Sequence, residues 1–465
     1  MEKSYKNKYG IWSGIALVVS ATLGCGIFIK IGDVLKVSEG SLQLSLLAWL
    51  VGGIIMIVSA FCFAVYASRI VKFGGLIDYV ENSSNKTIGY YLAYYLGAIY
   101  YPLFSSQIAI IASQYVLRCF TDDANIYINS YITILFAFSL ITIFFVLNLF
   151  APKIANYFQI SVLFVKLAPL LLIILVGLFS SFIAGAPGIV RAFIEPATDV
   201  ADKVSSFGEA IKITSFAYDG WICVTSLNAE MKNSKKNLPK VIIIGTAVIV
   251  ILYLIFFIGF SSILGNKAII ENGPLAGCIA FMKIFNSAGS IIFLLFLSLS
   301  CIGTFSANYF CASRSLIALG YRNLGFMPKR MIKTNSNGDF TFVPYIFSYM
   351  FCLLFLVIWY LANRQDIPYF NYLKDMDTIS CALLYLPFIL MYIKIMRSFK
   401  NENVIIRFIM PALATIGGIF FIFCGTGIYQ LIVNKDLKPF LSFLIYISLC
   451  AVMMLPALAM KRQKN

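Results

Sequence analysis

Residues 211–224 read IKITSFAYDGWICV, an apolar stretch that Tyr218, Asp219 and Gly220 interrupt near its centre. A charged side chain in the middle of a membrane span costs about 2.5 to 3.5 kcal/mol on insertion scales. Glycine inside a helix costs a further ~1 kcal/mol relative to alanine. The stretch therefore predicts a membrane helix that breaks at these three residues, and the cost of the break indicates a functional position.

The rest of the chain is a series of similar apolar stretches. Of its 465 residues, 60% are hydrophobic and 12% are charged, and the mean hydropathy is +0.88. A soluble domain has fewer apolar and more charged residues, and a membrane span needs about 20 apolar residues. The sequence predicts an all-α membrane protein with twelve spans, at residues 11–36, 42–68, 87–117, 130–150, 154–180, 206–230, 239–264, 287–318, 342–363, 378–396, 408–432 and 438–460. An extra short helix outside the membrane is expected between Asn272 and Ser290.

A second interruption lies in the first predicted span, where Gly24, Cys25 and Gly26 follow one another. Taken alone, the two glycines are typical of close helix packing through small residues, which is common in membranes. The first and sixth spans lie five helices apart, however, so their breaks occupy equivalent positions in spans one to five and six to ten. Paired breaks of this kind indicate an inverted-repeat transporter with its binding site at the breaks.

The exposed peptide groups at such breaks suit an amino acid. The N-terminal end of a half-helix presents N–H groups and a positive dipole end to a carboxylate, and the opposing ends present carbonyls to an ammonium. Irregular backbone at that depth is tolerated only where it lines a cavity. The sequence therefore predicts a small zwitterion as the ligand.

The charges of the chain indicate its orientation. The net charge is +16, but Lys and Arg lie in short connectors between spans, so nucleic acid is not an expected partner. Connectors on the side of the two termini carry more than twice as many Lys and Arg as those on the opposite side. By the positive-inside rule, both termini are predicted to be cytoplasmic in a multi-pass protein of the cell membrane.

Covalent chemistry is not predicted. The chain has no His, which excludes the common Ser–His and Cys–His catalytic pairs and His-containing zinc sites. The cysteines lie in or beside apolar runs without metal-ligand spacing, so no catalytic residue, metal or cofactor is expected. A channel would need rings of pore-lining polar residues, whereas the spans hold two isolated central charges, Lys166 and Asp219. A non-transporting receptor or scaffold fits the composition but gives no reason for two related breaks.

The motifs at these positions resemble those of the amino acid-polyamine-organocation superfamily, and within it the L-type amino acid transporter family with its bacterial serine/threonine-exchanger-like members. Residues 24–28 are similar to the GSGIF motif of the family's first helix, with Cys25 in place of the usual serine. Residues 216–221 are similar to its FAY(G/D)GW motif. Further matches over most of the chain are the EEMKNP-like residues 230–233, the NLP at 237–239, Gly74-Gly75, Tyr101-Pro102, Ser105-Ser106-Gln107, Arg314, Arg322, Gly325 and Pro328.

The resemblance implies a LeuT-like fold. Its 5+5 inverted-repeat core would cover residues 1–400, with a first repeat at about 11–180, a second at about 206–396, and two accessory helices in 401–465. The substrate carboxylate would meet the N–H groups of Cys25 and Gly26, the ammonium would meet the carbonyls of Thr22, Phe216 and Asp219, and Phe216 would be an aromatic gate. The expected substrate-binding residues are Thr22, Gly24, Cys25, Gly26, Phe216, Ala217, Tyr218 and Asp219.

The resemblance also assigns a coupling role to Lys166. It matches a lysine of the fifth helix that lies where sodium-coupled relatives hold a sodium ion, so its ammonium would replace the cation. The expected function is sodium-independent exchange of neutral L-amino acids by alternating access, and the alternative is proton-coupled uptake of cationic amino acids or polyamines. For Asp219, one interpretation has its carboxylate contacting the substrate, and the other has it capping the broken helix.

The expected partners are the amino acid substrate and the lipid bilayer. Eukaryotic members of the family pair with a single-span glycoprotein through a cysteine between the third and fourth helices. Cys119 lies nearby but outside the matching motif, so no obligatory protein partner is expected.

Overall fold

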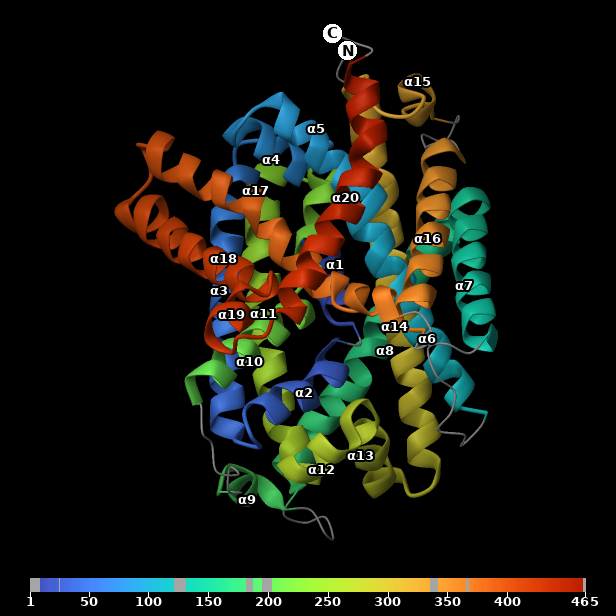
Figure 1. Cartoon of the computed structure of the whole chain (residues 1–465), viewed down its shortest axis with the longest axis vertical. Helices are drawn as coiled ribbons and strands as arrows, with labels where there is room; N and C mark the ends of the chain where they lie inside the picture. The colour runs from blue at the N-terminus through green and yellow to red at the C-terminus, as the bar shows by residue number, and fades with distance from the viewer. Residues whose placement is uncertain are drawn as a thin grey trace.

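The chain folds as a bundle of long helices (Figure 1). The computed structural model describes residues 9–24, 26–120, 131–180, 187–194, 203–334, 342–364 and 368–462. Within these ranges, eleven helices are long and apolar enough to span a membrane, and the bent pair α1 (Ile11–Thr22) and α2 (Gly26–Val37) makes a twelfth. The predicted all-α membrane protein is confirmed.

Most predicted spans are confirmed to within a few residues. The continuous ones are α3 (Leu42–Ala67), α7 (Tyr131–Phe150), α8 (Pro152–Leu178), α11 (Ser234–Leu264), α14 (Ala288–Tyr321), α16 (Phe342–Ala362), α17 (Met376–Ser398) and α20 (Lys438–Arg462). The third span has three parts, α5 (Lys86–Tyr95), the π-helical η1 (Leu96–Tyr100) and α6 (Tyr101–Arg118). Single π-helical turns are rare and often lie at functional sites.

The two predicted breaks are present. α1 and α2 meet at an angle of 47°. The sixth span consists of α10 (Lys203–Ala217), a turn at Tyr218–Gly220 and the 3-10 helix η3 (Trp221–Glu230). The tighter winding of η3 was not predicted from its apolar sequence. A 3-10 helix of this length is uncommon and is typical of a hinge or of strain.

The segment between the seventh and eighth spans is longer than predicted. It contains α12 (Asn266–Asn272), η4 (Gly273–Leu275) and α13 (Ala276–Phe285). Together these residues are apolar enough to count as one of the eleven candidate spans. Neither α12, with 7 residues, nor α13, with 10, is long enough to cross a ~30 Å hydrocarbon core. If this segment is not counted as a span and the broken sixth helix is counted instead, the described residues contain the predicted twelve spans.

The predicted eleventh span, 408–432, is wrong as a continuous helix. It consists of the π-helical η6 (Ile405–Ile409), α18 (Met410–Gly425) and the short α19 (Ile428–Val433). The chain turns between α18 and α19 because Gly427 adopts φ +76°, a left-handed conformation that glycine takes readily. The remaining short helices are α4 (Leu76–Ser83), α9 (Gly188–Ile194), α15 (Pro328–Met331) and η5 (Pro368–Leu373).

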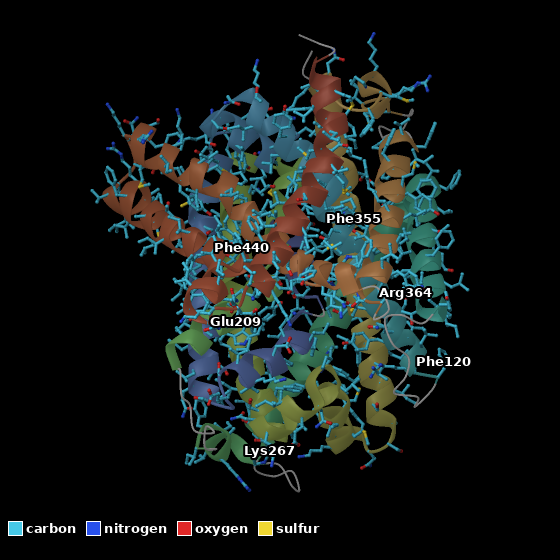
Figure 2. The ribbon with its side chains drawn as sticks, viewed as in Figure 1. Phe120, Glu209, Lys267, Phe355, Arg364 and Phe440 are labelled. Atoms are coloured by element: carbon cyan, nitrogen blue, oxygen red, sulfur yellow. The ribbon has the colours of Figure 1, made fainter. Side chains whose placement is uncertain are left out.

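The bundle has two distinct ends. We call the end that holds α4, α15 and the C-terminal end of α20 the terminal end, and the end that holds α9, α12 and α13 the far end (Figure 1). Lys267 of α12 marks the far end in Figure 2. Large apolar side chains are exposed on the outer helix α7, including Tyr131, Leu135 and Phe150. Such a surface suits lipid rather than water.

Candidate functional site

The break in the first membrane helix exposes the start of α2. α1 ends at Thr22, and the amide of Gly24 donates to the Thr22 carbonyl (2.8 Å). α2 begins at Gly26, so its first N–H groups have no carbonyl partner within the helix and lie at the positive end of its dipole. Cys25 lies outside the described residues, and its expected contact therefore stays a prediction.

Both glycines of this break lie against neighbouring elements. A Cβ atom at Gly24 would lie 2.9 Å from Thr304 Oγ1 on α14, and one at Gly26 would lie 3.1 Å from Ala217 Cα at the end of α10. Both distances are shorter than an ordinary van der Waals contact. Glycine at these positions therefore allows the first helix to approach its neighbours closely.

The break in the sixth helix depends on Gly220. This residue has φ +99°, which glycine adopts without the steric cost of a side chain. A Cβ atom there would lie only 2.6 Å from the carbonyl oxygen of Ala21. Any other residue at position 220 would therefore separate the sixth helix from α1.

The two breaks contact each other and share one hydroxyl group. Gly220 lies against Ala21, and Gly26 lies against Ala217. Tyr253 of α11 places its Oη 3.0 Å from the Thr22 carbonyl and 3.2 Å from the Ala217 carbonyl. Unpaired carbonyls at membrane depth are costly, so Tyr253 stabilises the ends of α1 and α10 together.

Phe216 lies at the end of α10 beside this junction. Its half-buried ring is 6.0 Å, centre to centre, from the ring of Phe104 on α6. Lys30 Nζ of α2 lies 5.2 Å from the centre of the Phe216 ring, within cation–π distance. The expected gate residue thus contacts the far-side half of the first helix.

Tyr218 points away from the junction. Its hydroxyl donates to the Trp49 carbonyl of α3 (2.9 Å), and its ring packs on the rings of Trp49 and Tyr253. Only 3% of the residue is exposed. In this arrangement its backbone, rather than its side chain, is available to the break.

Thr22 has a side chain that is available for a ligand. Its Oγ1 is buried and has no hydrogen-bond partner among the described residues. Its carbonyl, which we expected to meet the ammonium, already accepts from Gly24 N and lies near Tyr253 Oη. A buried polar atom without a partner is costly, and a bound ligand is one group that would satisfy it.

Asp219 turns its carboxylate toward the third span. Tyr100 Oη donates to Asp219 Oδ1 at 2.6 Å. Tyr100 is the last residue of η1, so the π-helical turn sets the direction of its side chain. Asp219 is half-buried as a whole residue, and the bond from Tyr100 holds one oxygen of its carboxylate.

Lys166 of α8 connects three helices. Its fully buried ammonium donates to the Ser20 carbonyl of α1 (2.5 Å) and to Thr304 Oγ1 of α14 (2.7 Å). Ser20 lies in the last turn of α1, just before the break. Lys166 is therefore next to the junction but reaches it through α1.

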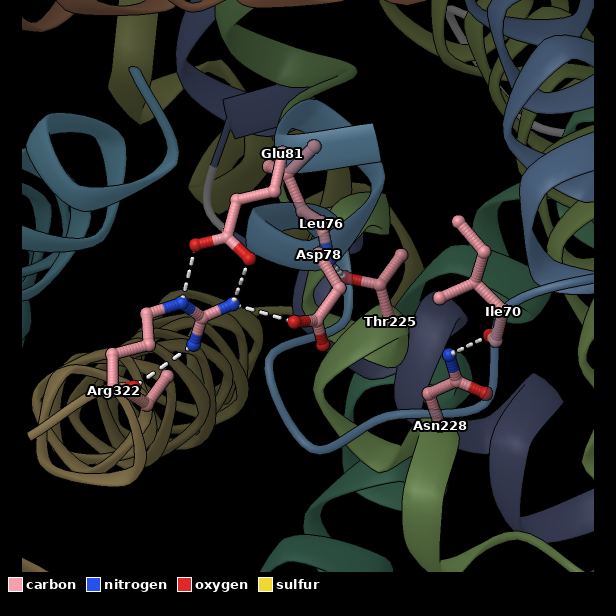
Figure 3. A network of polar contacts seen from close by, with 8 residues as sticks. Ile70, Leu76, Asp78, Glu81, Thr225, Asn228 and Arg322 are labelled. Atoms are coloured by element: carbon pink, nitrogen blue, oxygen red, sulfur yellow. Dashed lines mark hydrogen bonds and ion pairs between the residues drawn. The ribbon is translucent and has the colours of Figure 1, made fainter. Parts of the chain in front are cut away.

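η3 is held at the terminal end by α4 and the loop before it (Figure 3). Leu76 N donates to Thr225 Oγ1 (3.3 Å), and Asn228 Nδ2 donates to the Ile70 carbonyl (2.7 Å). Gly75 lies so close to η3 that a Cβ atom there would be 2.2 Å from the Thr225 carbonyl oxygen. This end of the sixth helix is therefore closed against its neighbours.

Ion pairs strengthen the same closure. Arg322, after the end of α14, pairs with Asp78 and Glu81 of α4, each at 2.5 Å (Figure 3). Burial raises the pKa of Asp78, and the Arg322 guanidinium opposes that rise. Arg314 pairs with Glu230 at the end of η3 (3.0 Å). Two backbone hydrogen bonds, from Tyr9 N to the Glu230 carbonyl (3.2 Å) and from Lys232 N to the Tyr9 carbonyl (2.9 Å), add Tyr9 to this closure.

The junction contains residues that the sequence interpretation missed. Tyr253, Tyr100 and Thr304 supply its hydroxyl groups, and Ser20 supplies the carbonyl for Lys166. A single tyrosine or threonine in an apolar helix has no sequence pattern that distinguishes it from a packing residue. Only the meeting of distant helices identifies these groups.

The chain matches the model of a known family. The family "Amino acid permease" matches residues 9–456. The curated relatives include a serine/threonine exchanger of Bacillus subtilis, 27% identical over 322 residues that make up 69% of this chain and 70% of the relative.

Two mouse proteins are also similar. The b(0,+)-type amino acid transporter 1 is 25% identical over 68% of this chain and 63% of the relative. The large neutral amino acids transporter small subunit 2 is 26% identical over 67% of this chain and 58% of the relative. The matched region thus spans less than two thirds of the length of these two relatives.

Proposed function

We propose that this chain, which belongs to the amino acid permease family, is a sodium-independent exchanger of neutral L-amino acids that works by alternating access. Its family makes it a transporter of amino acids and not an enzyme. The observation that carries the finer proposal is the contact of the two helix breaks, Gly220 on Ala21 and Gly26 on Ala217. This contact brings the N-terminal end of α2 beside the C-terminal ends of α1 and α10.

The substrate groups have complementary partners at this junction. The N–H groups at the start of α2, with Cys25 and Gly26, suit the carboxylate. The carbonyl ends of α1 and α10 suit the ammonium, and Thr22 Oγ1, which has no hydrogen-bond partner among the residues described, supplies a further contact. Phe216 covers the site from the far side. Gly24, Ala217, Tyr218 and Asp219 complete the proposed binding set through their backbone or small size.

Lys166 supports independence from sodium. Its ammonium lies between a main-chain carbonyl and a threonine hydroxyl, the kinds of oxygen that coordinate hard cations. A fixed cation at this position leaves no electrostatic need for a sodium ion. Replacing external sodium by N-methylglucamine should therefore leave uptake unchanged, and a sodium requirement would contradict this assignment.

The architecture proposed with this function has two parts. Residues 1–400 form the inverted-repeat core, with repeats at about 11–180 and 206–396, and residues 401–465 form the accessory helices. Both termini lie in the cytoplasm at the cell membrane, which makes the terminal end cytoplasmic. The chain works without an obligatory protein partner. Cys119 Sγ donates to the Tyr115 carbonyl (3.3 Å) within its own helix.

Exchange is tested in lipid vesicles that contain the purified chain. Vesicles loaded with unlabelled neutral amino acids should take up labelled L-serine, L-threonine or a larger neutral amino acid faster than empty vesicles. The inactive control is the Lys166→Met variant, which removes the ammonium and keeps an apolar side chain of similar length. We expect it to lose exchange. Absence of trans-stimulation by every amino acid would refute the proposal.

A second function is favoured by one observation. Asp219, a half-buried residue at the break of the sixth helix, has a carboxylate that suits a cationic amino acid or a polyamine taken up with protons. In this case Asp219→Gly should abolish uptake of labelled L-arginine and spermidine. Under the leading proposal, the carboxylate caps the break through Tyr100, and the variant should retain its preference for neutral amino acids. Uptake of neither cation by the unmodified chain would exclude the second function.

A further inference from the structure

An accessory helix contacts the far-side half of the sixth helix. Gln430 Nε2 of α19 donates to Glu209 Oε2 of α10 at 2.9 Å. A Cβ atom at Gly208 would lie 3.3 Å from the ring of Tyr429. α19 and α10 are neighbours in Figure 1, and Figure 2 labels Glu209. The half-helix α10, which carries Phe216, therefore packs against a segment outside the proposed ten-helix core.

α19 itself is held firmly. Gln430 is 4% exposed, and its carbonyl accepts from Asn434 N (3.0 Å) and Asp436 N (3.1 Å) in the turn that leads to α20. A Cβ atom at Gly427 would lie 2.5 Å from the Phe440 amide nitrogen, so the turn before α19 packs directly on α20. These contacts make α19 a fixed support rather than a loose connector.

The carboxylate of Glu209 has two partners. Lys212, one turn along α10, lies 3.0 Å from Oε1, whereas Gln430 lies near Oε2. The pair with Lys212 moves with α10 and does not hold it in place. The bond to Gln430 joins α10 to another element. Any tilt of α10 away from α19 must therefore break it.

α10 transmits this contact to the substrate gate. Phe216 lies at its C-terminal end, next to Lys30 of α2, and Ala217 contacts Gly26 at the junction. Glu209 lies two turns before Phe216 on the same helix. A change in the position of α10 at Glu209 therefore changes the position of Phe216.

We propose that Gln430 is a positioning residue of the transport cycle, which holds α10 in the arrangement that has the terminal end closed. The proposal rests on the alternating-access function proposed above. In the proposed cycle, closure of the far end moves α10 together with α2 away from α19, so the Gln430–Glu209 bond exists in one state and not in the other. An interaction made in only one state shifts the equilibrium between the two. The last two helices thus take part in gating.

The test compares substrate affinity on the two faces of the membrane. Gln430→Leu removes the donor and keeps the volume, so the state that binds substrate from the far side is less populated. Because apparent affinity scales with the populated fraction of the competent state, we expect the KM for labelled L-serine to rise about three- to tenfold at the far face. At the terminal face, the KM should fall. Right-side-out and inside-out vesicles measure the two values.

Four further variants separate positioning from a general loss of stability. Glu209→Leu should reproduce the effect of Gln430→Leu, and the double variant should add nothing. Glu209→Gln keeps an acceptor for the Gln430 amide. Its far-side KM should therefore lie closer to that of the unmodified chain than the KM of Glu209→Leu does. Ile432 lies on the same helix as Gln430 and is 64% exposed, so Ile432→Ala should leave both KM values unchanged.

The outcomes distinguish this inference from the proposed function. Lack of serine exchange by the unmodified chain, together with lack of exchange of every other neutral amino acid, refutes the function itself. Normal exchange with unchanged KM values in Gln430→Leu overturns the inference alone. A lower maximal rate with both KM values unchanged also overturns it, because that result indicates only less folded protein.

Discussion

Gly220 provides a quantitative test of the contact between the two broken helices. In Gly220→Ala, the alanine must keep φ near +99°. This left-handed conformation costs about 1–2 kcal/mol for an L-residue. The new methyl group also approaches the Ala21 carbonyl oxygen to 2.6 Å and Thr22 N to 3.2 Å. Because these atoms belong to the backbone, the helices must separate, at about 1–3 kcal/mol for overpacking. The sum of the two costs (~1–2 and ~1–3 kcal/mol) predicts that the free energy of unfolding falls by about 2–5 kcal/mol.

Gly273 supplies a matched control for this substitution. It also has a positive φ, +48°, but a Cβ atom there would meet nothing within 4 Å. Its ψ of −125° differs from that of Gly220, and such a sparsely populated region costs other residues about 1–3 kcal/mol, so Gly273→Ala carries a comparable conformational cost without the contact. We expect Gly220→Ala to melt a few degrees below Gly273→Ala in detergent. Separation of the breaks should also lower the affinity for substrate at least tenfold, since one hydrogen bond to a charged group is worth about 1.5–3 kcal/mol.

The measurements are a thermal melt of both purified variants and counterflow of labelled L-serine in vesicles. The Gly273 variant should retain more exchange than the Gly220 variant. The reasoning fails if Gly220→Ala melts no lower than Gly273→Ala and exchanges normally. In that case the two breaks do not depend on the backbone contact between Gly220 and Ala21.

Two further predictions concern the groups that hold the broken helices. Arg322→Ala leaves the 6% exposed Asp78 without its partner and should lower the free energy of unfolding by about 3–5 kcal/mol. Burial raises the pKa of Asp78, so protonation favours the folded state. In thermal melts from pH 8 down to pH 5, the difference in Tm between Arg322→Ala and the unmodified chain should shrink as the pH falls. A difference that stays constant would contradict this. The exposed pair Lys267–Glu271 is the control, and Lys267→Ala should change stability by less than ~1 kcal/mol. Tyr253→Phe should cost about 1 kcal/mol and slow exchange, whereas Tyr218→Phe, which loses a bond to Trp49 O, should cost as much and leave the KM for serine unchanged.

The breaks were predictable from the sequence because each contains residues that oppose a helix. Gly24 and Gly26 in the first span, and Asp219 with Gly220 in the sixth, are visible against a long apolar background. The offset of five spans then relates the two positions without any knowledge of contacts. The proposed binding set comes from the family resemblance of these two motifs, and Cys25 lies outside the part of the chain that the structure describes.

Other features have no such local signal. The 3-10 winding of η3 and the π-helical η1 occur in stretches that read as ordinary apolar helix. The turn at Gly427 was missed because one glycine in a membrane helix usually indicates packing. Tyr253 and Thr22 are 231 residues apart in the chain. Their contact depends on how whole helices pack, and periodicity within one helix contains no information about it.

The short helices between spans provide an independent argument for the proposed inverted repeat. α4, which follows the second span of the first proposed repeat, contacts η3 of the second through Leu76 and Thr225. α12 and η4, which follow the second span of the second proposed repeat, contact α2 of the first. There a Cβ atom at Gly32 would lie 3.3 Å from Gly273 Cα and 3.3 Å from the Ile269 carbonyl oxygen.

The first contact lies at the terminal end and the second at the far end (Figure 1). Each proposed repeat thus uses the connector at the same place in its chain order to hold the broken helix of the other, at opposite ends of the bundle. A two-fold axis in the membrane plane requires this exchange, whereas an unrelated bundle of helices has no reason to produce it. A glycine allows close backbone approach at both connectors: a Cβ atom at Gly75 would lie 2.2 Å from the Thr225 carbonyl oxygen, and one at Gly32 would lie 3.3 Å from Gly273 Cα. Because these are close backbone contacts, a broken helix that moves must either carry the connector of the other proposed repeat with it or separate from that connector.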